Sequence, residues 1–180
     1  YNGAFTTKEE FENYVKEKGS STLSENKSTD NSRVILALSA IGKDARNVAG
    51  YNLLEPYADF EYVTWQGING PVFALIALDT YGYDIPTDSS VSEQTTREKL
   101  VDYILENVLE NGGWTFFGTT ADPDMTGMAI QALAPYYNTN EAVKTAVDKA
   151  VGVLSDMQKS NGGFASWGTV NSESCAQVVT

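Results

Sequence analysis

The stretch Asn111-Gly-Gly-Trp-Thr-Phe-Phe-Gly-Thr119 returns as Asn161-Gly-Gly-Phe-Ala-Ser-Trp-Gly-Thr169, with the same spacing of asparagine, glycine and aromatic residues. The two copies begin fifty residues apart, and each lies between a charged amphipathic segment and a nearly uncharged one. A repeat at such a period is typical of an array of supersecondary units, none of which buries its apolar face alone. The repeat therefore predicts hairpins of two helices joined by a glycine-rich turn.

Charged amphipathic segments form the first helix of each predicted hairpin. In segment 141–158, apolar residues recur with a period of about 3.6 residues, and the charged side chains fall on the opposite face. The residues expected to face inward there are Val143, Ala146, Val147, Ala150, Val151, Leu154 and Met157. Segment 95–110 repeats the pattern, and segment 8–18 is a weaker example.

The second helix of each hairpin is almost without charge. Four segments share this character: 33–41, 71–78, 126–133 and 174–180. Helices that are apolar nearly all round are surrounded by protein. Alternating charged outer and apolar inner helices, about eight in four hairpins, predict an all-α domain that curls into a partial ring, an α/α toroid.

Start and stop signals frame these helices. The predicted starts are Thr29-Asp30, Pro71, Asp122-Pro123 and Ser172 with Ser174, and the predicted ends are Ile41-Gly42 and Tyr81-Gly82. We expect strands to be short, in segments 60–66 and 114–117, and we expect no sheet core. The whole chain, 1–180, is predicted to be a single domain.

Composition narrows the range of functions. A net charge of −12 disfavours binding to nucleic acid or to anionic lipid surfaces. No apolar run approaches the roughly 20 residues of a membrane-spanning helix. The chain has no histidine, which excludes histidine bases, histidine nucleophile pairs and histidine metal ligands from this stretch. Its one cysteine, Cys175, excludes an intrachain disulfide.

The two ends of the sequence suggest a longer protein. Tyr1 is not a methionine, and Thr180 falls inside the fourth inner helix. We therefore expect a fragment that lacks part of the ring, with any signal peptide, surface anchor or flanking domain outside it.

Two motifs carry a resemblance to a known superfamily. Gln158-Lys-Ser-Asn-Gly-Gly-Phe164 resembles the Gln-x-x-x-Gly-x-aromatic repeat of squalene-type cyclases. Ala121-Asp-Pro-Asp-Met-Thr-Gly-Met-Ala-Ile-Gln-Ala-Leu133 resembles the inner-helix starts of these cyclases and of the helical domain of cobalamin carriers. Over about residues 8–180 the chain is thus similar to the terpenoid cyclase and protein prenyltransferase superfamily. The whole pattern also resembles a domain of secreted or wall-attached proteins of Gram-positive gut bacteria.

What the resemblance implies is more specific for fold than for function, because this toroid hosts unrelated activities. It implies an extracellular or cell-wall-attached domain for binding or display. A small hydrophobic or cobalamin-like ligand and flanking domains of the same polypeptide are the implied partners. We expect no enzymatic activity and no cofactor.

Asp122-Pro-Asp124-Met125 resembles the Asp-x-Asp-Asp motif in which class II terpene cyclases carry their catalytic acid. The resemblance implies an alternative in which Asp124 protonates a substrate, with Asp122 beside it, in a cyclase-like or other carboxylate-dependent enzyme. Met125 replaces the third carboxylate. The structural interpretation is that Asp122 caps a helix, Pro123 occupies the first turn, and Asp124 complements the helix dipole. We favour this second interpretation.

Glu173-Ser-Cys175 resembles the Asp-x-Cys zinc ligands of prenyltransferase β subunits. The resemblance implies a zinc alternative with Glu173 and Cys175 as ligands, but the histidine that would complete it is missing. A lone cysteine beside an uncharged helix is more often a small buried apolar residue. We expect no metal.

Aromatic residues recur just before the predicted inner helices, among them Trp65, Trp114, Phe117, Phe164 and Trp167. They either pack between hairpins or line the mouth of the toroid as stacking surfaces for a flat ligand. Helix starts expose unpaired N–H groups, which favours ligand binding at the same rim. The candidate binding residues at this rim are Trp65, Phe117, Asp124, Trp167 and Glu173.

Overall fold

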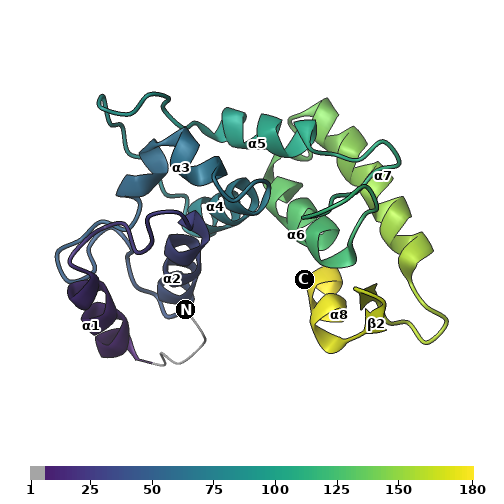
Figure 1. Cartoon of the computed structure of the whole chain (residues 1–180), viewed down its shortest axis with the longest axis horizontal. Helices are drawn as coiled ribbons and strands as arrows, with labels where there is room; N and C mark the ends of the chain where they lie inside the picture. Colours follow the sequence, from purple (N-terminus) through teal and green to yellow (C-terminus); the bar gives the residue numbers. More distant parts are fainter. Residues whose placement is uncertain (1–6) are drawn as a thin grey trace. The chain divides into compact units, whose positions relative to one another are not determined.

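Helices make up most of the structure, a computed structural model that describes residues 7–180 (Figure 1). The α-helices are α1 (Lys8–Lys18), α2 (Ser28–Ala40), α3 (Phe60–Thr64), α4 (Asn69–Thr80), α5 (Arg97–Glu106), α6 (Pro123–Leu133), α7 (Glu141–Met157) and α8 (Ser172–Val179). The remaining elements are the 3-10 helices η1 (Glu55–Ala58) and η2 (Ala134–Tyr136) and the antiparallel strands β1 (Ala165–Ser166) and β2 (Thr169–Val170). The mainly helical class, with eight α-helices in the described residues, agrees with the sequence-based prediction.

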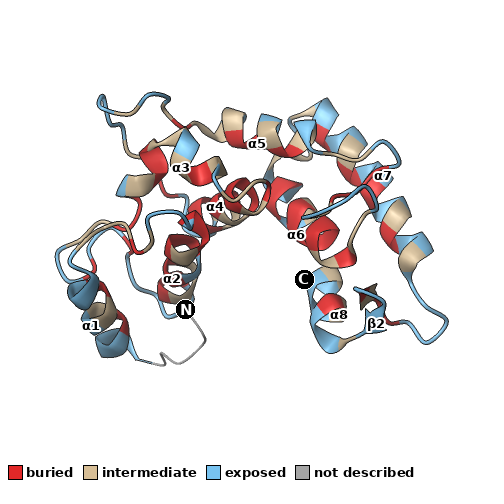
Figure 2. Cartoon of the chain, in the orientation of Figure 1, coloured by how far each residue is buried: buried red, intermediate tan, exposed pale blue. Residues whose placement is uncertain are grey.

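The chain divides into two compact units, Tyr1–Leu100 and Val101–Thr180, with the boundary inside α5. Within the first unit α2 packs most extensively on α4, and within the second α6 packs on α7 and α8. Figure 2 shows that α2, α4 and α6 are largely buried, whereas α1 and α7 each keep an exposed face. The uncharged helices α2, α4 and α6 are therefore the interior of the two units, as their composition predicts. The fourth helix expected to be buried, α8, is mostly exposed and has Ser174 as its one buried residue, so that part of the prediction is wrong.

Close packing between α6 and α8 depends on a glycine. A Cβ atom added to Gly127 would lie 2.5 Å from the backbone oxygen of Gln177 on α8. Only a residue without a side chain fits at this distance, so the two helices approach each other backbone to backbone.

Several of the predicted helix ends are confirmed. The side chain of Asp122 caps α6, and Pro123 occupies its first position. Both α2 and α4 stop just before the glycines expected to end them, Gly42 (φ +69°) and Gly82 (φ +63°).

One predicted start is wrong in detail, and at another the helix begins at the predicted Ser172 but is capped by a different residue. Thr29 lies inside α2, which begins at Ser28, and the Thr29 backbone N–H and hydroxyl donate to Gln66 Oε1 at 3.2 and 3.0 Å. The cap of α8 is Asn171, whose side chain accepts from Ser174 N–H at 2.7 Å. The helix α2 begins one residue before Thr29, and the residue that caps α8 lies one position before Ser172.

The predicted strands are also corrected. Residues 60–64 form α3, because the Asp59 carboxylate accepts from Glu61 N–H at 3.0 Å and starts a helix. Segment 114–117 contains no strand, and the hairpin lies at 165–170 instead.

On α7, Val151 was expected to face inward but is 53 % exposed, because the buried stripe of that helix is narrower than predicted.

Candidate functional site

The two glycine loops of the second unit share one backbone pattern. In each, the residue two positions before the Asn-Gly-Gly sequence bonds to the second glycine. These bonds are Leu109 N–H to Gly113 O at 3.0 Å and Lys159 N–H to Gly163 O at 2.9 Å. The first glycines, Gly112 and Gly162, have φ values of +92° and +81°. Glycine adopts this left-handed conformation without steric penalty, so the repeated sequence specifies a repeated turn.

The aromatic residue after each turn is part of the core. Trp114 is fully buried, and its Nε1–H donates to Ile104 O at 2.8 Å. Phe164, its counterpart in the second copy, is 5 % exposed. The packing interpretation is therefore confirmed for these two rings.

The fourth residue after each helix cap ties the aromatic residue to the next helix. Thr126 of α6 accepts from Trp114 N–H at 3.0 Å and donates to Trp114 O at 3.1 Å. Cys175 of α8 is at the equivalent position, and its Sγ accepts from Phe164 N–H at 3.5 Å. The thiol thus replaces the threonine hydroxyl in the second copy of the loop.

After the buried aromatic residue the two loops differ. The first copy continues irregularly and presents Phe116 and Phe117, whose rings meet edge to face with centroids 4.2 Å apart. The second copy forms the β1–β2 hairpin, in which Trp167 and Gly168 make the two-residue loop. Phe117 is 68 % exposed and Trp167 is 87 % exposed, so neither ring belongs to the core.

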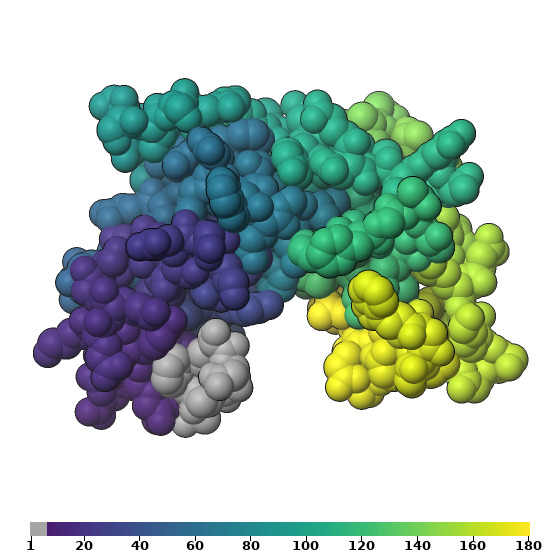
Figure 3. All heavy atoms as spheres, viewed as in Figure 1, coloured from purple at the N-terminus to yellow at the C-terminus, as the bar shows by residue number. Residues whose placement is uncertain are grey.

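These exposed rings border one cleft of about 390 Å³ in the second unit. Figure 3 shows two of the contributing segments, the green loop near residue 120 and the yellow C-terminal segment, next to each other. Residues from the first loop, the end of α7 and the hairpin line this cleft, which we call the aromatic cleft. They are Thr115, Phe116, Phe117, Thr120, Ala121, Asp122, Pro123, Met157, Lys159, Ala165 and Trp167.

Asp122 holds the inner end of the aromatic cleft together. Its Oδ1 accepts from the backbone N–H groups of Asp124 and Met125 at 3.0 and 3.1 Å, and its Oδ2 accepts from Ser166 Oγ at 2.5 Å. Both carboxylate oxygens therefore have structural partners. Lys159 differs, because its ammonium group forms no ion pair with any residue of the described chain.

Asp124 does not line the aromatic cleft. It lies in the first turn of α6, where a carboxylate complements the helix dipole. Its Oδ1 is buried and accepts no hydrogen bond from the described residues. This is the one observation that keeps a chemical role for Asp124 open to test.

Glu173 and Cys175 lie on α8 in different surroundings. Glu173 is exposed, and hydrogen bonds from its own backbone N–H and from the Ser172 hydroxyl lower the pKa of its carboxyl group. Cys175 is half-buried and bonded to the Phe164 backbone. Within residues 7–180, no three side chains of the histidine, cysteine, aspartate or glutamate type come together in a group that could hold a metal ion.

The sequence-predicted rim residues are thus distributed over both units. Phe117 and Trp167 share the aromatic cleft, whereas Trp65 belongs to the first unit, at the end of α3, and is 66 % exposed. Sequence reasoning missed Lys159 and Met157 as cleft residues. The only feature of the sequence that could have marked them is their position a few residues before the second Asn-Gly-Gly sequence.

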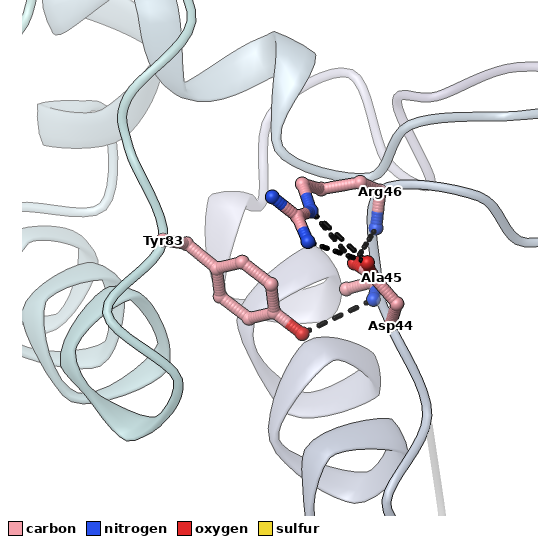
Figure 4. Close-up of polar contacts among 4 residues, drawn as sticks. All are labelled: Asp44, Ala45, Arg46 and Tyr83. Carbon is pink, nitrogen blue, oxygen red and sulfur yellow. Dashed lines mark hydrogen bonds and ion pairs between the residues drawn. The ribbon is translucent and has the colours of Figure 1, made fainter.

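A polar cluster in the first unit joins Tyr83 to the loop after α2 (Figure 4). The Tyr83 hydroxyl accepts from Ala45 N–H at 3.1 Å, and the Arg46 guanidinium lies 5.8 Å from the centre of the Tyr83 ring. Arg46 also forms a forked ion pair with Asp44, with Nη2 2.7 Å from Oδ2. The Arg46 hydrogen bonds hold the pKa of Asp44 below its ordinary value. These contacts fix the loop after α2, and the polar groups of the cluster are bound by other groups of the same unit.

No family model, curated protein or solved structure matches the chain. Among the described helices, none has both the length and the apolar character needed to cross a membrane.

Proposed function

We propose that this chain is a non-enzymatic ligand-binding module and that the aromatic cleft of the second unit is its binding site. The observation that carries the proposal is the exposure of Phe117 and Trp167 at one cleft of about 390 Å³. Clefts of a few hundred Å³ that combine apolar walls with a few polar groups are typical of small-molecule sites. Large exposed apolar side chains gathered at one place favour an interaction role over a purely structural one.

The proposal includes the arrangement and the setting of the domain. We infer an α/α toroid, present as a partial ring, of the terpenoid cyclase and prenyltransferase type. The alternation of charged and uncharged helices supports it, as does the packing of α2 on α4 and of α6 on α8. We place the domain outside the cell or on the cell wall, next to other domains of the same polypeptide. The net charge of −12 supports a partner other than nucleic acid.

A hydrophobic or cobalamin-like ligand is the first class to test. Purified chain is titrated with farnesol and with cyanocobalamin by isothermal calorimetry. Trp167→Ala is expected to weaken binding about tenfold or more, because exposed aromatic anchors carry much of the energy of such contacts. Tyr136→Ala, in η2 after the opposite end of α6, is the matched control and is expected to leave affinity unchanged. Equal losses in the two variants would overturn the placement of the site.

The enzyme alternative centres on Asp124 because of its buried Oδ1 without a partner. A catalytic acid must hold a proton near neutrality and give it to a substrate. We expect Asp124→Asn to abolish no turnover in a screen against polyprenyl substrates and to lower the stability by about 0.3–1 kcal/mol through the lost dipole interaction. Product formation by the unmodified chain that is lost in Asp124→Asn would establish the enzyme instead.

A further inference from the structure

The backbone at the rim of the aromatic cleft suggests what its ligand is. Trp167 and Gly168 form the two-residue loop between β1 and β2, with φ values of +53° and +83°. Two positive φ values in such a loop are the pattern of a type I′ turn, which favours Asn-Gly. A bulky residue rarely adopts this conformation, and when it does the cause is often functional. Trp167 is also 87 % exposed, so packing does not compensate for the strain.

A second turn in the chain shows what the fold alone requires. Ala49 and Gly50 connect the bridged residues Val48 and Tyr51, with φ values of +52° and +91°. Here the first position holds a small side chain, which projects little into solvent. The turn geometry therefore needs no aromatic ring, and the indole of Trp167 requires another explanation.

We infer, building on the proposed function, that the aromatic cleft binds a neutral carbohydrate and that Trp167 is the platform on which a pyranose ring stacks. A pyranose ring has an apolar face of C–H groups and a rim of hydroxyl groups. The apolar face fits an exposed indole or phenyl ring, and Phe117 provides the second ring on the facing loop. The volume of about 390 Å³ is near the lower end for ligand sites, which suits one or two sugar rings.

The polar groups of the cleft match the hydroxyl rim. The Thr115 hydroxyl donates to Phe117 O at 2.9 Å and can still accept, while Lys159 offers an ammonium without an ion-pair partner in the described chain. Thr120 adds a second hydroxyl. A sugar both donates and accepts hydrogen bonds, so it can use all three groups. A prenyl chain offers no hydrogen-bonding group to any of the three, and a polyproline segment would offer only carbonyl acceptors.

Charge favours a neutral sugar over a charged ligand. The cleft carries one cation, Lys159, and one anion, Asp122, whose oxygens are occupied by the α6 N-terminus and Ser166. These opposite charges leave little net field in the cleft. The acidic chain as a whole would repel an anionic glycan.

The test uses the whole chain and a panel of neutral oligosaccharides: cellohexaose, maltohexaose, xylohexaose and chitohexaose. Binding is measured by calorimetry and by the three indole N–H resonances in a ¹H–¹⁵N NMR spectrum, since the chain has three tryptophans. The resonance that disappears in Trp167→Asn is expected to shift when a sugar binds. The resonances of the other two tryptophans are expected to stay in place.

Trp167→Asn separates a binding role from a structural one, because asparagine suits the type I′ turn better than tryptophan. We expect it to raise the melting temperature and to weaken sugar binding more than tenfold. Ala49→Asn is the matched control: it should raise the melting temperature and leave the affinity unchanged. Phe117→Ala is expected to weaken binding several-fold. A lower melting temperature in Trp167→Asn, or unchanged sugar affinity, would overturn the inference.

Three further probes distinguish failure of the inference from failure of the proposed function: a ten-residue polyproline peptide, cyanocobalamin and farnesol. If one of these binds in a Trp167-dependent way and no sugar does, the carbohydrate class is wrong and the cleft remains a binding site. If no probe of either panel binds, both proposals are overturned.

Discussion

The two units hold their loops in different ways. In the first unit, polar side chains reach across long stretches of sequence to bond loop backbones. Asn31 of α2 does so with three groups, accepting from Leu23 N–H at 2.9 Å and donating to Ser21 O and Leu53 O at 2.7 and 2.9 Å. In the second unit, glycine turns and a buried aromatic ring do most of this work locally, although Lys149 donates to Glu110 O and Ser166 donates to Asp122 across longer stretches of sequence. In the second arrangement the contacts lie at the base of each loop, so the side chains at the loop tips remain exposed. Phe117 and Trp167 of the aromatic cleft are at these tips.

The largest expected effect is in the second unit. Trp114→Ala should lower the free energy of unfolding by about 4 kcal/mol, since it empties a fully buried site. Trp114→Phe, which installs the residue of the second copy, should lower it by about 1–2 kcal/mol, because Ile104 O loses its donor. Both changes are to be measured by urea denaturation. A loss below about 2 kcal/mol for Trp114→Ala would mean that the ring is not central to the unit.

In the first unit, Asn31→Ala should lower the free energy of unfolding by about 3 kcal/mol. Three backbone groups lose their partner, the buried Leu23 N–H and Leu53 O and the half-buried Ser21 O, and each unsatisfied buried group is costly. Asn31→Asp is the control, because it keeps the shape and the acceptor to Leu23 but loses the two donated bonds. Hydrogen exchange of residues 19–27 and 42–54 should accelerate in both variants. Unchanged exchange there would contradict the tethering role.

This contrast also explains what could be predicted from the sequence. The turns and helix starts of the second unit could be predicted because each is specified by residues adjacent in the sequence. These are the Asn-Gly-Gly turn, the aromatic residue that follows it and the Asp122-Pro123 helix start. The helical class and most helix positions followed from periodicity. Exposure of Phe117 and Trp167 did not, because the repeat places a ring at equivalent positions without saying which rings are covered.

The first unit was harder to predict, because the contacts that hold its loops join residues far apart in the sequence. The partners of Asn31 lie up to 22 residues away, and nothing in the local pattern marks them. The same reason hid the contact of Thr29 with Gln66, 37 residues away, and led to a misplaced helix start. In the aromatic cleft, the part played by Lys159 depends on how the end of α7 meets the hairpin, which no local pattern encodes.

Tyr83→Phe tests one long-range tether of the first unit at smaller scale. The variant removes the hydroxyl that accepts from Ala45 N–H and keeps the ring beside Arg46. The free energy of unfolding should fall by about 1–2 kcal/mol, because the buried N–H group is left without a partner. Tyr81→Phe is the matched control, since Tyr81 is 55 % exposed and stacks on Tyr83; it should change stability by less than about 0.5 kcal/mol. Equal effects of the two variants would mean that the hydrogen bond from Ala45 N–H to the Tyr83 hydroxyl does not stabilise the folded chain.

The smallest expected effect is that of the exposed Asp44–Arg46 pair beside the same tether (Figure 4). Asp44→Asn should lower the stability at neutral pH by a few tenths of a kcal/mol, roughly the range of exposed ion pairs. Arg46 lowers the pKa of Asp44 in the folded state. The stabilisation that this pair provides is therefore fully present when the pH is above 3.8, the ordinary pKa of the group, and it is lost as the pH falls through the lowered pKa. The difference between the parent chain and Asp44→Asn should therefore vanish in acid, and added salt should reduce it at neutral pH.

Asp88→Asn supplies the control for this last effect. Hydrogen bonds from the Ser90 hydroxyl and backbone N–H lower the pKa of Asp88 without a cationic partner. Its contribution should also be lost as the pH falls through the lowered pKa of Asp88, because that pKa is shifted in the same direction as the pKa of Asp44. Unlike the Asp44 contribution, it should respond little to salt, since no ion pair is screened. Equal salt dependence of the two variants would mean that the charge of Arg46 is not what stabilises the folded form of Asp44.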